Sequence, residues 1–149
     1  MIWLEDIEVG ATERFGHYVV ERDEVIAFAR RYDPQPFHLS DEAAAETHFG
    51  RLSASGWHTA SMTMAMIVAH YRDIGFQSLG SPGVDELRWL KPVYPGDTLS
   101  CETEVVEARR SASRPEMGLV TSLLTVRNQD GAAVMRFRPT VMIRTRTPG

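Results

Sequence analysis

Hydrophobic positions follow two different spacings along the chain, and the change comes near its middle. Residues 12–20, TERFGHYVV, have the aromatic and β-branched content of a strand. Residues 21–32 then place apolar side chains at the spacing of one helical face, at Val25, Phe28, Ala29 and Tyr32. Asp23 and Glu24 stabilise the positive end of such a helix. The pattern therefore predicts a strand and then a helix that ends before the prolines at 34 and 36.

Two further helices are predicted before residue 75. Ser40 followed by DEAAAETHF indicates a short helix with a serine N-cap, acidic residues in its first turn and Gly50 as its terminator. Residues 57–71, WHTASMTMAMIVAHY, carry apolar or small side chains on nearly every face. A helix without a polar side is typically buried all round, and this one is too short and too polar to cross a membrane. We expect it to lie against or inside a curved sheet, with Met62, Met64 and Met66 filling the hydrophobic core around the helix.

Beyond Gly75 the apolar residues take the alternation typical of strands. Four strands are predicted, within residues 84–94, 97–111, 118–131 and 132–145, with the turn NQDG between the last two. The arginines at 136, 138, 144 and 146 have the spacing of one strand face rather than of a groove-binding patch. The expected fold is α+β, with an antiparallel sheet wrapped around one long helix.

Composition narrows the classes of function. The 149 residues suit a single domain spanning 1–149, and a net charge of −4 with interspersed signs predicts no nucleic-acid or anionic-membrane partner. One cysteine, Cys101, excludes an internal disulfide framework and a cysteine zinc site. The acidic start MIWLEDIEVG lacks the features of a signal peptide, so a cytoplasmic location is expected.

The stretch YDPQPFH, residues 32–38, holds the main candidate chemistry. Its two prolines exclude a helix and predict a stiff loop that fixes the separation of Asp33 and His38. A carboxylate and an imidazole suit general acid–base work and could grip one water molecule between them. The alternative is structural: Asp33 would cap a turn, as aspartate before proline often does, and His38 would be an ordinary loop histidine.

The second candidate is SASGWHTAS, residues 53–61, at the start of the apolar helix. Free backbone N–H groups there, with Gly56 allowing close approach, would suit the developing oxyanion of a thioester. The structural alternative is that Ser55 only caps the helix and Gly56 only forms a turn. A metal site built from His38, His48 and His58 is not expected, because neither HExxH spacing nor a cysteine partner is present.

Several segments together resemble the MaoC-like dehydratases, which include the (R)-specific enoyl-CoA hydratases. DPQPFH is similar to the hydratase motif Asp-x-Asn-Pro-x-His, and ASGWHTAS to the family's entry to its central helix. LRWLKPVYPGDTL and LEDIEVGAT resemble two further family segments, so that the resemblance runs from about residue 3 to 145 in the family's order. Three positions depart from the usual pattern, at Tyr32, Gln35 and Ser55, where the family often has Gly, Asn and His.

The resemblance implies a hotdog fold, normally as a homodimer or higher homo-oligomer, and a reversible hydration of trans-2-enoyl thioesters to (R)-3-hydroxyacyl thioesters. Asp33 and His38 would take the positions of the catalytic pair, and the Gly56 N–H that of an oxyanion donor. Substrate contacts would come from Gln35, Ser55, Phe37, Trp57 and Ser61. Coenzyme A would enter only as part of the substrate, with no metal or other cofactor.

Two other functions stay open from the sequence. One is a hotdog acyl-CoA thioesterase, although the carboxylate that such enzymes place on the central helix is absent from residues 57–71. The other is a non-catalytic protein that binds acyl thioesters or serves as a partner subunit.

Overall fold

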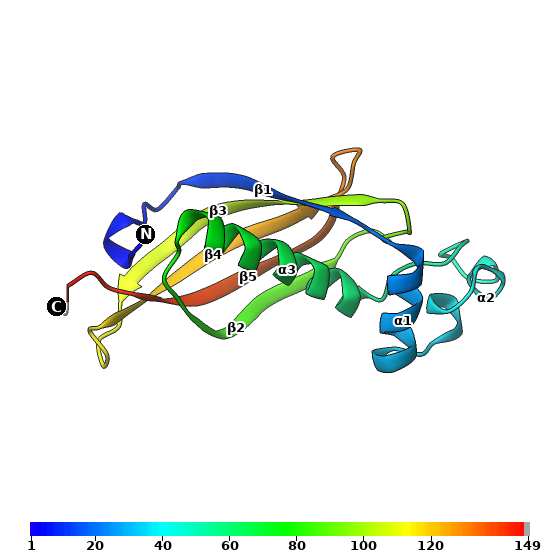
Figure 1. Ribbon diagram of the computed structural model, residues 1–149, viewed down its shortest axis with the longest axis horizontal. Coiled ribbons are helices and arrows are strands. Elements are labelled where there is room, and N and C mark those ends of the chain that lie inside the picture. Colours follow the sequence, from blue (N-terminus) through cyan, green and yellow to red (C-terminus); the bar gives the residue numbers. More distant parts are fainter. Residues whose placement is uncertain (148–149) are drawn as a thin grey trace.

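A computed structural model describes residues 1–147. Its five strands form one antiparallel sheet in the order β1-β3-β4-β5-β2, and the long helix α3 lies along one face of that sheet (Figure 1). Two shorter helices lie at one end of the molecule, while both chain ends lie near the other. The elements are a 3-10 turn at Leu4–Asp6, β1 Thr12–Val19, α1 Arg22–Tyr32, a 3-10 turn at Pro36–His38, α2 Asp41–Ala45, α3 Gly56–Ile74, β2 Ser78–Trp89, β3 Thr98–Arg110, β4 Met117–Arg127 and β5 Ala133–Arg144.

The core lies between α3 and the inner face of the sheet. Met62, Met66 and Ile67 of the helix are almost completely buried and belong to one cluster with strand residues such as Leu99 and Leu124. Burial of such side chains is the main stabilising term in folding. An antiparallel sheet around one central helix confirms the fold class predicted from the apolar pattern, and it is the hotdog fold that the family resemblance implies.

The central helix is not buried on every side, and this prediction was wrong. Trp57, Met64 and Val68 are 58%, 50% and 41% exposed, so Met64 is not core filler. These side chains share one stripe, because positions separated by four, seven and eleven residues lie on one helical face. The sheet does not cover this stripe, and Met64 and Val68 border an open apolar cavity between the helix and the sheet. A helix without a continuous polar side thus leaves an apolar surface uncovered in the single chain.

The strand β2 begins and ends earlier than predicted. It runs over Ser78–Trp89, because SLGSPG pairs with β5 despite its glycines and proline, and residues 90–94 leave the sheet. Pro82 is tolerated because β2 is an edge strand, and its pairing is interrupted by three register shifts. At its end, the N–H groups of Leu90 and Lys91 both point to the Val134 carbonyl before Pro92 stops the pairing.

The helix boundaries show the same mixture of agreement and correction. The α1 helix ends at Tyr32 as expected, but the Tyr32 side chain is 62% exposed rather than part of the inner face. The Ser40 hydroxyl accepts a hydrogen bond from the Ala43 N–H, which confirms the N-cap of α2. This helix nevertheless stops at Ala45, five residues before Gly50. The α3 helix ends at Gly75, whose φ of +69° is the left-handed conformation that glycine accommodates.

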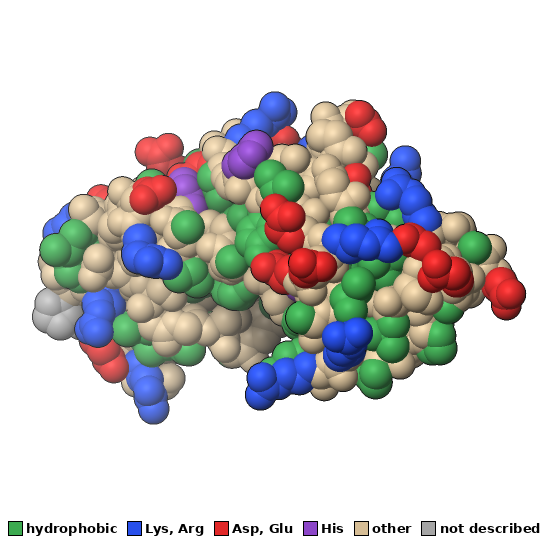
Figure 2. Space-filling view, turned by 45° about the vertical axis from the view of Figure 1, so that its right-hand side comes forward, with side chains coloured by type: hydrophobic (Ala, Val, Ile, Leu, Met, Phe, Trp, Pro, Cys, Tyr) green, Lys and Arg blue, Asp and Glu red, His purple; other side chains and the backbone are tan. Residues whose placement is uncertain are grey.

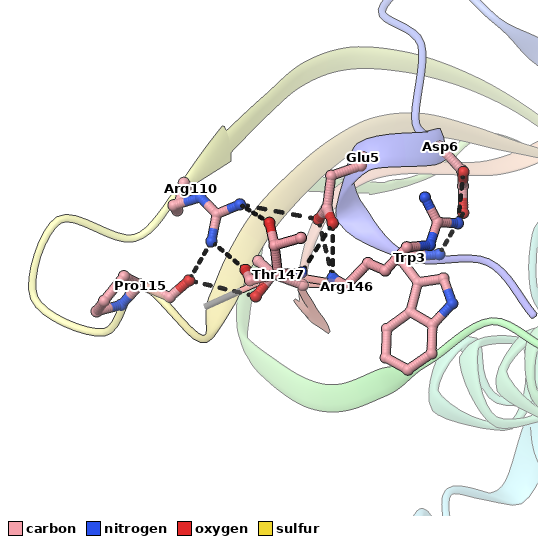
Figure 3. A network of polar contacts seen from close by, with 8 residues as sticks. Trp3, Glu5, Asp6, Arg110, Pro115, Arg146 and Thr147 are labelled. Atoms are coloured by element: carbon pink, nitrogen blue, oxygen red, sulfur yellow. Dashed lines mark hydrogen bonds and ion pairs between the residues drawn. The ribbon is translucent and has the colours of Figure 1, made fainter. Parts of the chain in front are cut away.

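An ion network joins the two chain ends (Figure 3). The Arg146 guanidinium donates to both oxygens of the Asp6 carboxylate, at 2.9 and 2.7 Å, and the Arg146 backbone N–H donates to Glu5. Arg110 donates to the carbonyl oxygen of Thr147 at 2.7 Å. These contacts hold the first turn of the chain against the end of the sheet.

The described surface has mixed charge. On the face in Figure 2, acidic and basic side chains alternate among hydrophobic patches without a broad region of one sign. Within residues 1–147, no helix combines the length and apolar character required to cross a bilayer.

Candidate active site

The proline loop brings Asp33 and His38 together. Asp33 is the residue that caps the C-terminus of α1, with its N–H bonded to the Ala29 carbonyl at 2.9 Å. The two prolines then turn the chain so that His38 falls in the following 3-10 turn. The Oδ2 atom of Asp33 lies 3.6 Å from the Nε2 atom of His38, and the two side chains are only 18% and 6% exposed. The loop therefore does hold the two titratable groups at one place.

Two side chains hold the Asp33 carboxylate. The Ser55 hydroxyl donates to Oδ2 at 2.7 Å, and the Gln35 amide donates to Oδ1 at 2.7 Å. Partial burial by itself raises the pKa of Asp33, but the hydrogen bonds from Gln35 and Ser55, and the positive charge of His38 when its imidazole is protonated, together lower it below the usual value. Asp33 is consequently a carboxylate at neutral pH, when it can only accept hydrogen bonds.

The orientation of His38 is set by a backbone carbonyl. Its Nδ1 atom lies 2.7 Å from the Ser53 carbonyl oxygen, and since that oxygen can only accept, Nδ1 carries the proton. In the neutral imidazole, Nε2 then presents a lone pair toward Asp33. The ring is also packed edge-on against Phe37 at a centroid distance of 4.6 Å and tilted against Phe49 at 5.8 Å.

The chemical consequence lies in the 3.6 Å between the two acceptors. This separation is too long for a direct hydrogen bond, and neither Nε2 of neutral His38 nor Oδ2 of Asp33 has a proton to share. A water molecule has two donors and can satisfy both atoms at once. A pair with this geometry can hold a proton-bearing group such as water between its two acceptors.

The start of α3 adjoins this pair through Ser55. The Ser55 hydroxyl that donates to Asp33 also accepts the Trp57 N–H at 3.3 Å, so that one side chain caps the helix and orients the carboxylate. Within residues 1–147, the Gly56 N–H donates to no protein acceptor. This first helical N–H, with the positive end of the helix dipole behind it, is free to receive an anionic oxygen.

Gly56 is small for a reason that the sequence did not indicate. A Cβ atom at this position would lie 2.5 Å from the Cε2 atom of Trp89, so the space beside its Cα is filled by an indole ring rather than left open for a ligand. The Trp89 Nε1–H also donates to the Gly56 carbonyl at 2.9 Å. Trp89 was missed in the sequence because it lies 33 residues further on, and no local pattern relates a strand end to a helix start.

The remaining predicted residues are divided between the interior and the surface. Phe37 braces His38 from a half-buried position, whereas Gln35 contacts Asp33 from the surface. Trp57 is exposed and meets Trp89 edge-on at 5.0 Å. Ser61 is exposed one turn further along α3, and its hydroxyl donates to the Trp57 carbonyl at 2.8 Å. Ser61 thus lies on the same side of α3 as Trp57, but makes no contact with Asp33 or His38.

Other histidines form separate contacts. His58 lies 3.1 Å from the Glu24 carboxylate and stacks on Phe28, and His70 pairs with Glu13 and stacks on Phe15. No three His, Cys, Asp or Glu side chains of the described chain come together as metal ligands would. An apolar cavity of about 790 Å³ lies between the C-terminal half of α3 and the sheet, with His70 and Phe15 in its wall, but Asp33 and His38 do not line it.

Comparison with known families fits this geometry. Residues 8–128 match the family described as the MaoC like domain. The chain belongs to this family. A curated relative, the 3-hydroxybutyryl-CoA dehydratase of Methylorubrum extorquens, is 30% identical over 91% of this chain and 84% of its own.

Solved structures of MaoC-like proteins superpose closely on this one. A MaoC-like dehydratase from Rhodospirillum rubrum is 39% identical, with a TM-score of 0.87 over 99% of both chains. An (R)-hydratase from A. caviae involved in PHA biosynthesis is 26% identical, with a TM-score of 0.71 over 92% of this chain and 97% of the other. These similarities confirm the resemblance drawn from DPQPFH and LRWLKPVYPGDTL, and place this MaoC-like chain among hotdog dehydratases and hydratases.

Proposed function

We propose that this MaoC-like protein reversibly hydrates trans-2-enoyl-CoA thioesters to (R)-3-hydroxyacyl-CoA thioesters. The single observation that carries the proposal is the pair of opposed acceptors, Asp33 Oδ2 and His38 Nε2, separated by 3.6 Å. Relatives named 3-hydroxybutyryl-CoA dehydratase and (R)-hydratase support the reaction class. Mesaconyl-CoA hydratase of Cereibacter sphaeroides adds support over a shorter region, 39% identical across 74 residues.

In the proposed hydration, Asp33 and His38 each accept one hydrogen bond from the attacking water. As its oxygen bonds to C3, the pair removes one water proton, and the electrons of the double bond move through C2 to the thioester oxygen. A proton then returns from the pair to C2 as the carbonyl re-forms. The two groups lie 3.6 Å apart, and in this proposal the transferred proton is assigned to the pair rather than to one residue.

The developing negative charge is on the thioester oxygen, and the Gly56 N–H is the proposed donor to it. No protein group competes for this N–H within the described residues, and the 19-residue helix α3 aligns its dipole behind it. A donor of this kind commonly accounts for a factor of about 10²–10³ in rate. Coenzyme A enters only as part of the substrate, and the chemistry requires neither a metal nor a redox group.

The other predicted residues have supporting roles in this proposal. Ser55 and Gln35 orient Asp33, and Phe37 limits the rotation of His38, as their contacts indicate. Trp57 and Ser61 lie on the exposed side of α3, where they would contact substrate as it approaches the helix start.

We further propose that the protein works as a homodimer through the exposed stripe of α3. Trp57, Met64 and Val68 form an apolar surface of a kind that isolated proteins usually cover. Met64→Glu would place a charge in the centre of this stripe, and we expect it to convert a dimer to a monomer in sedimentation experiments. Val9→Glu, at a 63% exposed apolar residue away from the stripe, is the control. A monomeric wild-type protein at micromolar concentration would contradict the dimer.

The reaction is tested with crotonyl-CoA and purified wild-type protein. Hydration removes the absorbance of the conjugated thioester without releasing free thiol, and chiral analysis should give the (R)-3-hydroxy product. Release of free thiol would instead indicate a thioesterase. Binding of crotonyl-CoA without either change would indicate a non-catalytic acyl-thioester protein, and both outcomes would overturn the proposed hydration.

Asp33→Asn and His38→Gln should each lower kcat for crotonyl-CoA by about 10²–10⁴-fold, because each removes one acceptor for the water proton. Circular dichroism should show that both variants stay folded. Asp73→Asn and His48→Gln change the same residue types at exposed positions and should retain wild-type kcat. Near wild-type rates in both active-site variants would show that the assigned pair does not act on water.

A further inference from the structure

The contact between Trp89 and Gly56 joins parts of the chain that are far apart in sequence. Trp89 is the last residue of β2 and pairs with Met135 of β5, while Gly56 is the first residue of α3. The next residue after Trp89, Leu90, is bonded through its N–H to the Val134 carbonyl at 2.8 Å. The backbone at Trp89 and at the residue after it is therefore fixed by pairing with β5, and the indole projects from this fixed position.

Two independent features fix Gly56 against this indole. The Nε1–H donates to the Gly56 carbonyl at 2.9 Å, and the ring occupies the space where a Cβ atom at residue 56 would be, with Cε2, Cδ2 and Nε1 all within 2.7 Å of that point. The backbone φ of Gly56 lies outside the left-handed region, so the glycine is required for room rather than for conformation. Trp89 is 45% exposed, and burial of the indole alone does not account for this geometry.

The carbonyl that Trp89 holds is one bond from the Cα atom that carries the free N–H. Ser55 fixes the other side of the same turn, because its hydroxyl bonds both the Trp57 N–H and Asp33. The first turn of α3 is thus held from two directions, by Ser55 toward Asp33 and by Trp89 toward the sheet. A donor to a developing oxyanion is effective only when it is already aimed before the charge appears.

We propose that Trp89 is a positioning residue that aims the Gly56 N–H at the thioester oxygen. This inference rests on the proposed hydration and on Gly56 as the donor, and it assigns to Trp89 a role in transition-state stabilisation without contact with the reacting atoms. Trp89 acts in two ways: its N–H orients the peptide after Gly56, and its ring closes the space beside the Gly56 Cα.

The first test separates the hydrogen bond from the packing. Trp89→Phe retains an aromatic ring but lacks the donor, and we expect kcat for crotonyl-CoA to fall about 5–20-fold with KM within twofold of wild type, because a transition-state interaction is weakened. Trp3→Phe makes the same change at the distant chain end and should leave both constants unchanged. Unchanged kcat in Trp89→Phe, or a rise in KM alone, would overturn the inference.

The second test uses the predicted clash. Gly56→Ala should lower kcat by at least about 10²-fold, because the new Cβ displaces the indole or the helix start. Trp89→Ala removes the indole that causes the clash. In that background, Gly56→Ala should lower kcat by less than a further threefold. Simple multiplication of the two single effects would show that the residues act independently and would overturn the inference.

A binding measurement distinguishes failure of this inference from failure of the proposed function. Acetoacetyl-CoA binds as an enolate where an oxyanion donor is present, and the enolate has its own ultraviolet absorbance. We expect Trp89→Phe to weaken enolate formation about 5–20-fold while the Kd of butyryl-CoA stays within twofold of wild type. Equal effects on both ligands would overturn the positioning role, whereas wild-type protein that hydrates no crotonyl-CoA would instead overturn the proposed function.

Discussion

Ser55 has two partners, and it is the residue that connects the chemistry to the central helix. Its hydroxyl donates to Asp33 and accepts from the Trp57 N–H, and the residue is fully buried. Histidine is frequent at this position in the family. In this chain the serine caps the helix and supplies a neutral donor that favours the ionised form of Asp33.

Ser55→Ala should lower kcat for crotonyl-CoA about 3–10-fold and destabilise the fold by about 1 kcal/mol, since both the cap and the bond to Asp33 are lost. The pKa of Asp33 should rise toward its usual value, because the ionised form loses a donor. Carboxyl carbon NMR and thermal unfolding are the measurements. Ser40→Ala, at the N-cap of α2, should lose comparable stability without changing kcat or the pKa of Asp33; the same drop in kcat there would contradict the specific role of Ser55.

At the scale of elements, His58 links three of them near the site. It belongs to α3, stacks on Phe28 of α1 and lies 3.1 Å from Glu24, whose carboxylate also accepts the Tyr18 hydroxyl of β1. The buried Nδ1 atom of His58 has no partner among the described residues. Burial lowers the pKa of His58, and the Glu24 carboxylate only partly offsets that effect.

The lowered pKa of His58 gives stability a defined pH dependence. The unfolded chain takes up a proton at His58 near the ordinary pKa of 6.5, whereas the folded chain takes it up at lower pH. The stability that neutral His58 contributes is therefore complete above pH 6.5 and is lost as pH falls below that value. His58→Gln retains a donor for Glu24 but cannot titrate. We expect its Tm to fall about 2–4 °C less than that of wild type between pH 7.5 and 5.5, and His48→Gln to behave as wild type. Parallel pH profiles for wild type and His58→Gln would contradict this assignment.

At the scale of the whole molecule, both chain ends lie at the end of the molecule opposite to α1 and α2 (Figure 1). Asp6 contacts Arg146 and accepts the Trp3 N–H at 2.9 Å, and these contacts lower the pKa of Asp6, the Arg146 hydrogen bond most and the Trp3 N–H next. Because the pKa of Asp6 is lower in the folded chain than in the unfolded chain, its carboxylate stabilises the fold above pH 3.8, the ordinary value. This stabilisation is lost as pH falls below that value.

Asp6→Asn should therefore lower the Tm at pH 6 and have little effect at pH 2.5, where the wild-type carboxylate is already being protonated. The expected difference at pH 6 is about 1–3 °C, since exposed ion pairs contribute little individually. Asp130→Asn, in the exposed turn between β4 and β5, should show no such pH-dependent difference. Enzymatic hydration should be unaffected in both variants, because the termini do not reach the site.

Much of the fold could be predicted because it depends on local pattern. The helix at 22–32 and the strands after residue 97 follow directly from apolar spacing, which reflects which face of each element is buried. The edge strand β2 was misplaced because glycines and Pro82 contradict local strand preference, and only pairing with β5 overrides it. The exposed stripe of α3 was missed because composition shows that a helix has no polar face, but not what covers each side.

The sequence by itself determined the stiff loop that carries Asp33 and His38, because proline restricts backbone geometry wherever it occurs. It also indicated the family, because several motifs follow one another in the family's order. Only the tertiary structure decided that these side chains stand 3.6 Å apart, that Ser53 sets the imidazole tautomer and that Trp89 fills the space at Gly56. These contacts join residues that are far apart along the chain, and their geometry depends on how the strands and helices pack rather than on any local preference.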